Sequence, residues 1–290
     1  MSTVHSGQHQ VTAPQARALI AAQMPDLRHL PLRRIGLAGT DNVLYRVGPH
    51  HIARFPRLPH AAAQIDRQTL WLPRLTPLPL PIPLIQRTGL PSDDYPYRWT
   101  LLPWLPGRPA TAAFDQSHAA LTLAKFLKSL HSLPVPDHAP DLHLSDQLGL
   151  RFAAIDHFIT LFRGEADQTR LHLTAAKLRQ LPPYSGPRHW LHGDMHPLNL
   201  LILRGKLTGV IDWGTMGLGD PAMDLMAAWT VFDAPARARF RATLNPAPDT
   251  WNRGRALAFA KAVAAIPYYR HSNPALRDVM RLTLTRILAD

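Results

Sequence analysis

Hydrophobic and polar residues follow two different patterns along the chain, and the pattern changes near residue 110. Before that point, short apolar segments alternate with turn residues, which is typical of strands joined by tight turns. Two stretches in this part instead place apolar residues at helical spacing. The predicted elements are a helix over residues 14–24, strands over 32–37, 43–47 and 51–55, a helix over 59–72 and a strand over 97–102. The first three strands are expected to open a small antiparallel sheet.

Residues 73–91 contain six prolines, which exclude a helix because proline lacks the backbone N–H and clashes with the preceding turn. We predict an extended connection that ends in an edge strand over residues 82–86. A proline-rich docking motif is the functional alternative. It is disfavoured because the stretch is rich in leucine and lies between folded segments.

Beyond residue 112 the apolar positions recur with helical period, apart from one central stretch. The predicted helices cover residues 114–130, 144–162, 167–181, 221–232, 234–244, 250–266 and 273–288. The central stretch, residues 188–213, has an apolar run, a polar loop, a strand over 200–203, a turn at 204–206 and a second strand ending at Ile211. Gly205 suits the positive φ that a tight hairpin turn requires.

The polar residues of this central stretch carry the candidate chemistry. Asp194 and Asn199 lie in the loop, and Asp212 follows the second strand. The hairpin can bring these three side chains to one end. One carboxylate that orients a hydroxyl, together with an amide oxygen and a second carboxylate that bind magnesium, is what phosphoryl transfer requires.

The run His-Gly-Asp-Met-His-Pro-Leu-Asn at 192–199, followed by Ile-Asp-Trp at 211–213, resembles the aminoglycoside phosphotransferase family. Weaker similarity at 40–46 and 219–225 falls in the right order, so the resemblance covers roughly residues 30 to 230. It implies an α+β, two-lobed protein-kinase-like fold with a small antiparallel-sheet N-lobe and a mainly helical C-lobe. It also implies transfer of the γ-phosphate of ATP or GTP to a hydroxyl of a small molecule, with Mg²⁺. Aminoglycosides and other antibiotics are candidate acceptors, and metabolites remain open. The expected lobes are residues 1–102 and 108–290, joined by a hinge at 103–107.

The resemblance also assigns roles in the C-lobe. Asp194 is expected to be the catalytic base, and Asn199 and Asp212 to bind magnesium. His192 is expected to hold the catalytic loop by hydrogen bonds rather than to react, and His196 to tie the loop to the metal-binding segment. Two further acids are interpreted as structural, with Asp220 capping a helix and Asp224 bonding to the loop.

In the N-lobe, the turn that contains Gly39 and Thr40 is expected to cover the nucleotide phosphates with backbone N–H groups. Leu102 and Trp104 are expected to line the adenine slot at the hinge, although Trp104 is equally consistent with a core position.

The lysine–glutamate pair of kinase-like folds is absent here. No lysine precedes Lys125, and Glu165 is the one glutamate of the chain. We expect Arg54 to bind the phosphates instead, because a guanidinium can contact two phosphate oxygens. Gln68 is expected to take the place of the glutamate, since Asp66 would face another side of its helix.

Two other functional classes remain open. His192, Asp194 and His196 have the alternation of a zinc hydrolase site, but that interpretation leaves Asn199 and Asp212 unexplained. A nucleotide-binding protein with little turnover is suggested by the missing lysine and glutamate.

Composition adds bounds. The net charge of +12 comes without a dense basic run, so nucleic-acid binding is not expected. The last 57 residues contain three acids beside many arginines, which weighs against a strongly cationic acceptor. Acids in the 132–182 insertion could compensate, namely Asp137, Asp141, Asp146, Asp156 and Asp167. The chain has no cysteine and no apolar run of about 18 residues, so we expect no membrane span. With a polar start and no signal pattern, a cytoplasmic monomer or dimer is expected.

Overall fold

The structure is a computed structural model of the 290-residue chain that describes residues 9–36, 41–141, 147–162, 164 and 166–290. The chain divides into two compact units. The N-terminal unit consists of Met1–Pro77, Pro81–Pro106 and Asp212–Gly214, and the helical unit consists of Leu78–Leu80, Gly107–Ile211 and Thr215–Asp290. A short piece of the later chain is therefore part of the first unit.

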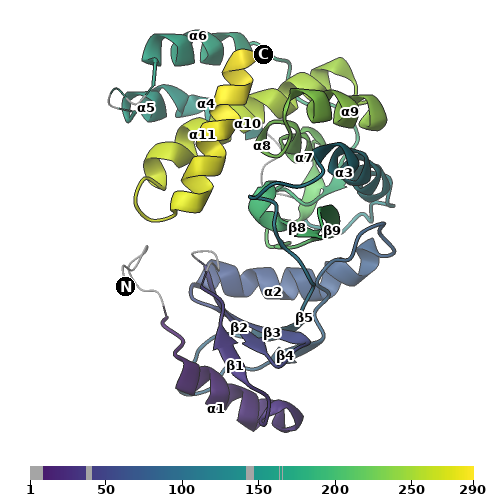
Figure 1. Ribbon diagram of the computed structural model, residues 1–290, viewed down its shortest axis with the longest axis vertical. Helices are drawn as coiled ribbons and strands as arrows, with labels where there is room; N and C mark the ends of the chain where they lie inside the picture. Colours follow the sequence, from purple (N-terminus) through teal and green to yellow (C-terminus); the bar gives the residue numbers. More distant parts are fainter. Residues whose placement is uncertain (1–8, 37–40, 142–146, 163, 165) are drawn as a thin grey trace. The chain divides into compact units, whose positions relative to one another are not determined.

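The N-terminal unit is built on a five-stranded antiparallel sheet with strand order β1-β2-β3-β5-β4. Its strands are β1 Leu32–Arg34, β2 Asn42–Val47, β3 His51–Pro56, β4 Arg87–Gly89 and β5 Trp99–Pro103. Its helices are α1 Ala13–Gln23 and α2 Pro59–Trp71, with short 3-10 turns at Pro25–Leu27 and Leu72–Leu75. The two helices cover opposite faces of the sheet (Figure 1).

The face toward α1 holds the apolar core of this unit. Alternate residues of β2 are buried there, and the Tyr45 hydroxyl donates to the Val11 carbonyl at 2.8 Å. Phe55 of β3 stacks on Trp99 of β5, with ring centroids 4.9 Å apart. Because side chains alternate along a strand, Arg54 points to the other face of the sheet, where α2 lies.

The sheet corrects one prediction. Residues 82–86 are not a strand, and the edge strand is β4 at Arg87–Gly89. Pro81 and Pro83 explain the shift, since a proline cannot donate to a strand ladder. The first strand ends at Arg34 rather than at residue 37, which lies outside the described residues.

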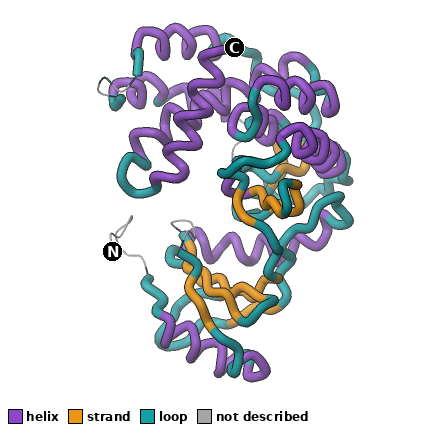
Figure 2. The backbone as a smooth tube through the Cα atoms, in the orientation of Figure 1, coloured by secondary structure: helices purple, strands orange, loops and turns teal. Residues whose placement is uncertain are grey.

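The helical unit contains two small sheets and the remaining helices (Figure 2). Its helices are α3 Gln116–His131, α4 Gln147–Ala153, α5 Ile155–Thr160, α6 Gln168–Leu178, α7 Ala222–Leu225, α8 Ala227–Thr230, α9 Ala234–Leu244, α10 Pro248–Tyr268 and α11 Pro274–Ala289, with a 3-10 turn at Pro197–Asn199. Its strands are β6 Arg108–Pro109, β7 His189–Leu191, β8 Leu200–Leu203, β9 Lys206–Val210 and β10 Gly217–Gly219.

The predicted hairpin in the central stretch is confirmed. Strands β8 and β9 pair antiparallel, and the turn between them holds Arg204 at φ 51° and Gly205 at φ 78°. Positive φ at both central residues is the geometry of a type I′ hairpin turn.

Two predicted helices are wrong as single elements. Within the described part of 144–162, the backbone breaks at Ala154, so α4 and α5 are separate. The segment 221–232 likewise forms two short helices, α7 and α8, that meet at Met226.

Helix α10 is the central helix of this unit and contacts α4, α5, α7, α8 and α11. Small residues along it allow this close packing: a Cβ added at Gly254 would lie 2.9 Å from the Cβ of Leu225. Among the described residues, no helix combines the length and apolar character needed to cross a membrane.

Candidate active site

The loop at 192–199 runs from β7 to β8, and a buried acid from α7 anchors its start. The fully buried Asp224 carboxylate accepts from the backbone N–H of His192 at 3.1 Å and of Gly193 at 2.8 Å. His131 Nε2 of α3 lies 3.1 Å from the same carboxylate. Gly193 has φ 82°, a conformation that strongly favours glycine. The predicted bond between Asp224 and the loop is therefore confirmed.

His192 is fully buried and fastens the loop to the second hairpin strand. Its Nδ1 accepts from the backbone N–H of Asp194 at 3.2 Å. The ring proton therefore belongs on Nε2, which donates to the Ile211 carbonyl at 2.9 Å. With both ring nitrogens engaged by backbone groups, His192 is placed to position the loop rather than to react.

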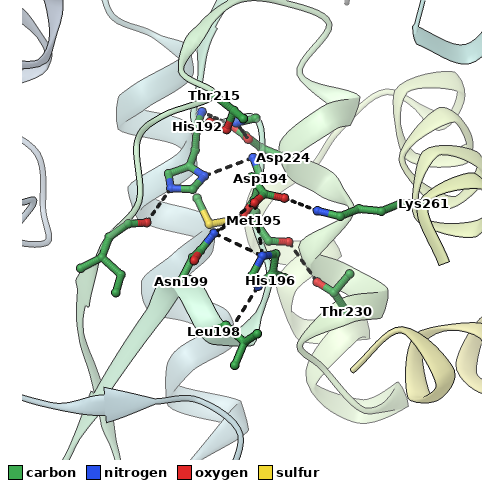
Figure 3. A network of polar contacts seen from close by, with 12 residues as sticks. His192, Asp194, Met195, His196, Leu198, Asn199, Thr215, Asp224, Thr230 and Lys261 are labelled. Atoms are coloured by element: carbon green, nitrogen blue, oxygen red, sulfur yellow. Dashed lines mark hydrogen bonds and ion pairs between the residues drawn. The ribbon is translucent and has the colours of Figure 1, made fainter. Parts of the chain in front are cut away.

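Asn199 and His196 surround the second oxygen of the Asp194 carboxylate (Figure 3). The Asn199 amide nitrogen donates to the Asp194 carbonyl at 2.9 Å and lies 3.4 Å from Asp194 Oδ2. His196 Nδ1 accepts from the Leu198 N–H, so its protonated Nε2 faces Asp194 Oδ2 at 3.3 Å. The amide oxygen of Asn199 takes no part in these bonds.

Lys261 of α10 approaches the other oxygen and forms an ion pair with Asp194 Oδ1 (Figure 3). Burial alone would raise the pKa of the Asp194 carboxyl, but the Lys261 ammonium and the His196 ring hold that pKa well below its usual value. The carboxylate is thus ionised and able to accept a hydrogen bond. Because 28% of this side chain remains exposed, a ligand can reach it.

Asp212 follows the hairpin directly. It is exposed and has φ 64°, a left-handed conformation that costs energy for a residue with a Cβ. The preceding Ile211 N–H donates to the Asn199 carbonyl at 2.9 Å. Strained backbone held by its neighbours is a frequent feature of functional sites.

Arg54 lies on the face of β3 that α2 covers. Its Nη1 donates to Gln68 Oε1 at 2.9 Å and its Nε to Thr100 Oγ1 at 3.3 Å. Asp66 instead pairs with the exposed Arg98. Burial lowers the pKa of the Arg54 guanidinium, and the Asp212 carboxylate opposes that shift. The predicted contact between Arg54 and Gln68 is present.

The donor set fits a nucleotide and a hard cation. Within the described part of the chain, Arg54 Nη2 is buried without a hydrogen-bond partner. A phosphate oxygen would satisfy that donor. The Asn199 amide oxygen and the Asp212 carboxylate are the oxygen ligands that Mg²⁺ prefers.

The zinc hydrolase interpretation is wrong. No three His, Cys, Asp or Glu side chains among the described residues are arranged to hold a metal. His192 in particular has both ring nitrogens bound to backbone groups.

The residues predicted to line the hinge have defined neighbours. Leu102 is buried, and the Trp104 N–H donates to the His50 carbonyl at 2.7 Å. The guanidinium carbon of Arg46 lies 4.1 Å from the centroid of the Trp104 ring, which is a cation–π contact. The turn with Gly39 and Thr40 lies outside the described residues.

A profile of the Phosphotransferase enzyme family matches residues 32–257, a range that includes Arg54, the loop at 192–199 and the hairpin. The chain belongs to this family. An aminoglycoside 3'-phosphotransferase from Escherichia coli is 28% identical to this chain over 160 residues, which are 52% of this chain and 57% of that relative. A relative of the same name from Salmonella typhimurium matches to the same extent. The match therefore spans little more than half the length of these curated relatives.

Solved structures show the fold of this chain. The GDP complex of aminoglycoside 2'-phosphotransferase-IIIa has a TM-score of 0.73 at 18% identity, over 95% of this chain and 98% of that chain. Macrolide 2'-phosphotransferase MphH from Brachybacterium faecium has a TM-score of 0.60 at 20% identity, over 92% and 97%. The predicted α+β, two-lobed protein-kinase-like fold is thus confirmed.

Sequence reasoning missed the cations beside Asp194. Lys261 was one available signal, because it is the one charged residue between Ala256 and Ile266. Burial lowers the pKa of Arg151 in α4, and the Asp194 carboxylate opposes that shift, so this guanidinium also acts on the site. Asp220 was interpreted as a helix cap. It accepts from the Ala222 N–H, but the N-cap position is Pro221.

A cavity of about 600 Å³ lies elsewhere in the helical unit. Phe152 and Ala153 of α4, Asp156 of α5 and two residues after α6, Arg179 and Leu181, line it. None of the catalytic-loop residues lines this cavity.

Proposed function

We propose that this protein transfers the γ-phosphate of ATP or GTP to a hydroxyl group of a small molecule. The observation that carries the proposal is the Asp194 carboxylate, whose pKa the Lys261 ammonium and the His196 ring hold well below its usual value while part of the side chain stays exposed. Membership of the phosphotransferase family supports the same reaction class.

In the proposed step, Asp194 accepts a hydrogen bond from the acceptor hydroxyl and orients its oxygen toward the γ-phosphorus. The acceptor oxygen forms a bond to phosphorus, and the bond from phosphorus to the β–γ bridging oxygen breaks. The nucleoside diphosphate leaves with that electron pair, and the hydroxyl proton passes to Asp194. Such a carboxylate has a low basicity, so its main contribution is orientation, with proton acceptance late in the step.

The nucleotide would be held by the N-terminal unit. Arg54 donates to phosphate oxygens, and Gln68 fixes its guanidinium by the hydrogen bond at 2.9 Å. The backbone around Gly39 and Thr40 covers the phosphates, and the backbone and side chains at Leu102 and Trp104 bind the base. Phosphate recognition by a buried, preorganised arginine costs little side-chain entropy.

Asn199 and Asp212 would hold Mg²⁺ through their side-chain oxygens. When bound, the ion supplies positive charge that neutralises the phosphates as the transferred group develops charge. The chain's own contribution is to fix these ligands: Asn199 through its amide nitrogen on Asp194, and Asp212 through the hydrogen bond between Ile211 and Asn199.

The first acceptors to test are aminoglycosides and other hydroxyl-bearing antibiotics. The curated relatives from Escherichia coli and Salmonella typhimurium are aminoglycoside phosphotransferases. Solved structures of the same fold include a GDP and kanamycin complex and a spectinomycin phosphotransferase.

A low-turnover nucleotide-binding protein is the second candidate, and the observation that favours it is the Arg54–Gln68 contact in place of a lysine–glutamate pair. Calorimetric titration with ATP and GTP, combined with detection of ADP or GDP over an acceptor panel, distinguishes the two. Binding without turnover on any acceptor supports this second candidate.

Asp194→Ala tests the assignment directly. Turnover should fall by roughly 10²- to 10⁴-fold, which is the usual contribution of a positioned base, while nucleotide affinity stays within about threefold. Asp249→Ala, a change at an exposed acid in the first turn of α10, is the matched control and should leave turnover unchanged. Full turnover in Asp194→Ala would exclude Asp194 as the base.

A further inference from the structure

Lys261 is a charged residue at the centre of a buried helix. The segment from Ala256 to Ile266 is otherwise apolar, and most of its side chains are buried against neighbouring helices. Burying an ammonium is costly unless it has a partner of opposite charge. Its partner here is Asp194, 67 residues away in sequence.

The surroundings of the Asp194 carboxylate are rich in positive charge and hydrogen-bond donors. Lys261 meets Oδ1, and His196 and Asn199 lie beside Oδ2. The Arg151 guanidinium is close enough for Asp194 to stabilise its charged form. A hydroxyl must nevertheless approach this carboxylate to be phosphorylated, and any charged group next to that hydroxyl comes close to Lys261.

Two acidic residues elsewhere in the unit pair with arginines. Asp156 binds Arg179, and Asp220 binds Arg253 at 2.6 Å. These carboxylates are therefore engaged, whereas an acceptor rich in ammonium groups would need acids that face it. A positive charge beside the catalytic base repels such an acceptor and attracts an oxyanion.

We propose that the acceptor carries a carboxylate or phosphate near the hydroxyl that is phosphorylated, and that Lys261 binds this oxyanion. The inference rests on the proposed function, because it identifies the reacting hydroxyl with the one that Asp194 orients. An ammonium has three N–H donors and the contact with Asp194 uses one, so Lys261 can bind both groups at once. Lys261 thereby determines acceptor specificity.

A set of hexoses that differ only at carbon 6 tests the charge preference. Glucose, 6-amino-6-deoxyglucose, glucuronate and glucose 6-phosphate present a hydroxyl, an ammonium, a carboxylate and a phosphate on the same ring. Their dissociation constants are measured by calorimetry with ADP and Mg²⁺ present, which fills the nucleotide site, and kcat/KM is measured with ATP and with GTP. One charge-assisted hydrogen bond predicts roughly 10- to 100-fold tighter binding of the anions than of glucose. The dissociation constants of glucuronate and glucose 6-phosphate show whether the site prefers a carboxylate or a phosphate.

Lys261→Met removes the charge and replaces lysine with an apolar side chain of similar length. The anion preference should fall to within about threefold, whereas Lys261→Arg should retain most of it. Lys177→Met, at an exposed lysine of α6, is the matched control and should keep the full preference. The wild-type preference order is itself a test, so the proposal does not depend on how well the Lys261→Met protein folds.

Three results would overturn the proposal. They are tighter binding of the amino sugar than of glucuronate by the wild-type protein, equal binding of all four sugars, and a Lys261→Met protein that loses activity on every acceptor alike while keeping its preference. The last would mean that Lys261 acts only on Asp194. Efficient phosphorylation of cationic acceptors refutes the oxyanion inference but upholds the proposed function. Selective anion binding without phosphate transfer upholds the oxyanion inference but refutes the proposed function.

Discussion

Asp224→Asn is the most informative single change in the fold, because one buried carboxylate holds the start of the loop at 192–199. Its two oxygens accept from the N–H groups of His192 and Gly193, and His131 Nε2 lies 3.1 Å away. Asparagine has nearly the same shape but offers one oxygen and one NH₂ group. One of the two backbone donors must then face another donor.

The magnitude follows from these contacts. Losing a hydrogen bond to a charged group costs about 1.5–3 kcal/mol, and an unsatisfied buried donor adds about 1–3 kcal/mol. We expect the free energy of unfolding to fall by about 3–5 kcal/mol in total. At about 2–4 °C per kcal/mol for a domain of this size, Tm should drop by roughly 6–20 °C.

The assay combines thermal unfolding with single-turnover kinetics. Below the new Tm, transfer should slow because the loop that carries Asp194 is no longer fixed, while nucleotide affinity stays close to that of the wild-type protein. Asp278→Asn is the matched control, since Asp278 is exposed and pairs with the neighbouring Arg277. A Tm within about 2 °C of the wild-type value, with unchanged transfer, would refute the anchoring role of Asp224.

Two further changes test the N-terminal unit. Arg54→Ala should weaken ATP binding or slow transfer by roughly tenfold or more, as expected for the loss of one charge-assisted contact, and Arg54→Lys should have an intermediate effect. If calorimetry shows an unchanged ATP affinity and the transfer rate is also unchanged, Arg54 does not bind the phosphates. Gly89→Ala should lower the free energy of unfolding by about 1–3 kcal/mol, because the added Cβ would lie 2.0 Å from the Trp99 ring. Gly36→Ala is its control in denaturant titrations, since nothing lies within 4 Å of a Cβ there, and equal stabilities of the two variants would contradict the packing argument.

The sequence predicted an element correctly where capping or turn residues lie at the ends of its apolar pattern. The helix predicted at 234–244 is α9 at Ala234–Leu244, because the Asp233 side chain caps its first turn and Asn245 ends it in a left-handed conformation. The hairpin was predictable for the same reason: its apolar strands flank a turn with a glycine.

Sequence patterns failed where the decisive contact joins residues far apart in the chain, or where a helix breaks at a residue that is not a helix breaker. Ala154 ends α4 although alanine favours helices, so no residue type there indicated the break. The loop residues of the candidate site were predictable because they are adjacent in sequence. The partner of Lys261 was not predictable: its isolation in an apolar segment is a local signal, but its pairing with Asp194 depends on how α10 packs.

The membership of Asp212–Gly214 in the N-terminal unit has a consequence for how the protein is made. During synthesis, residues up to Pro106 leave the ribosome long before Asp212–Gly214 do. A fragment that stops at Pro106 therefore lacks part of its own unit. The sheet can form early, but the unit reaches its full set of contacts only after most of the helical part has been synthesised, so the last steps of folding of the two units are linked through one continuous chain.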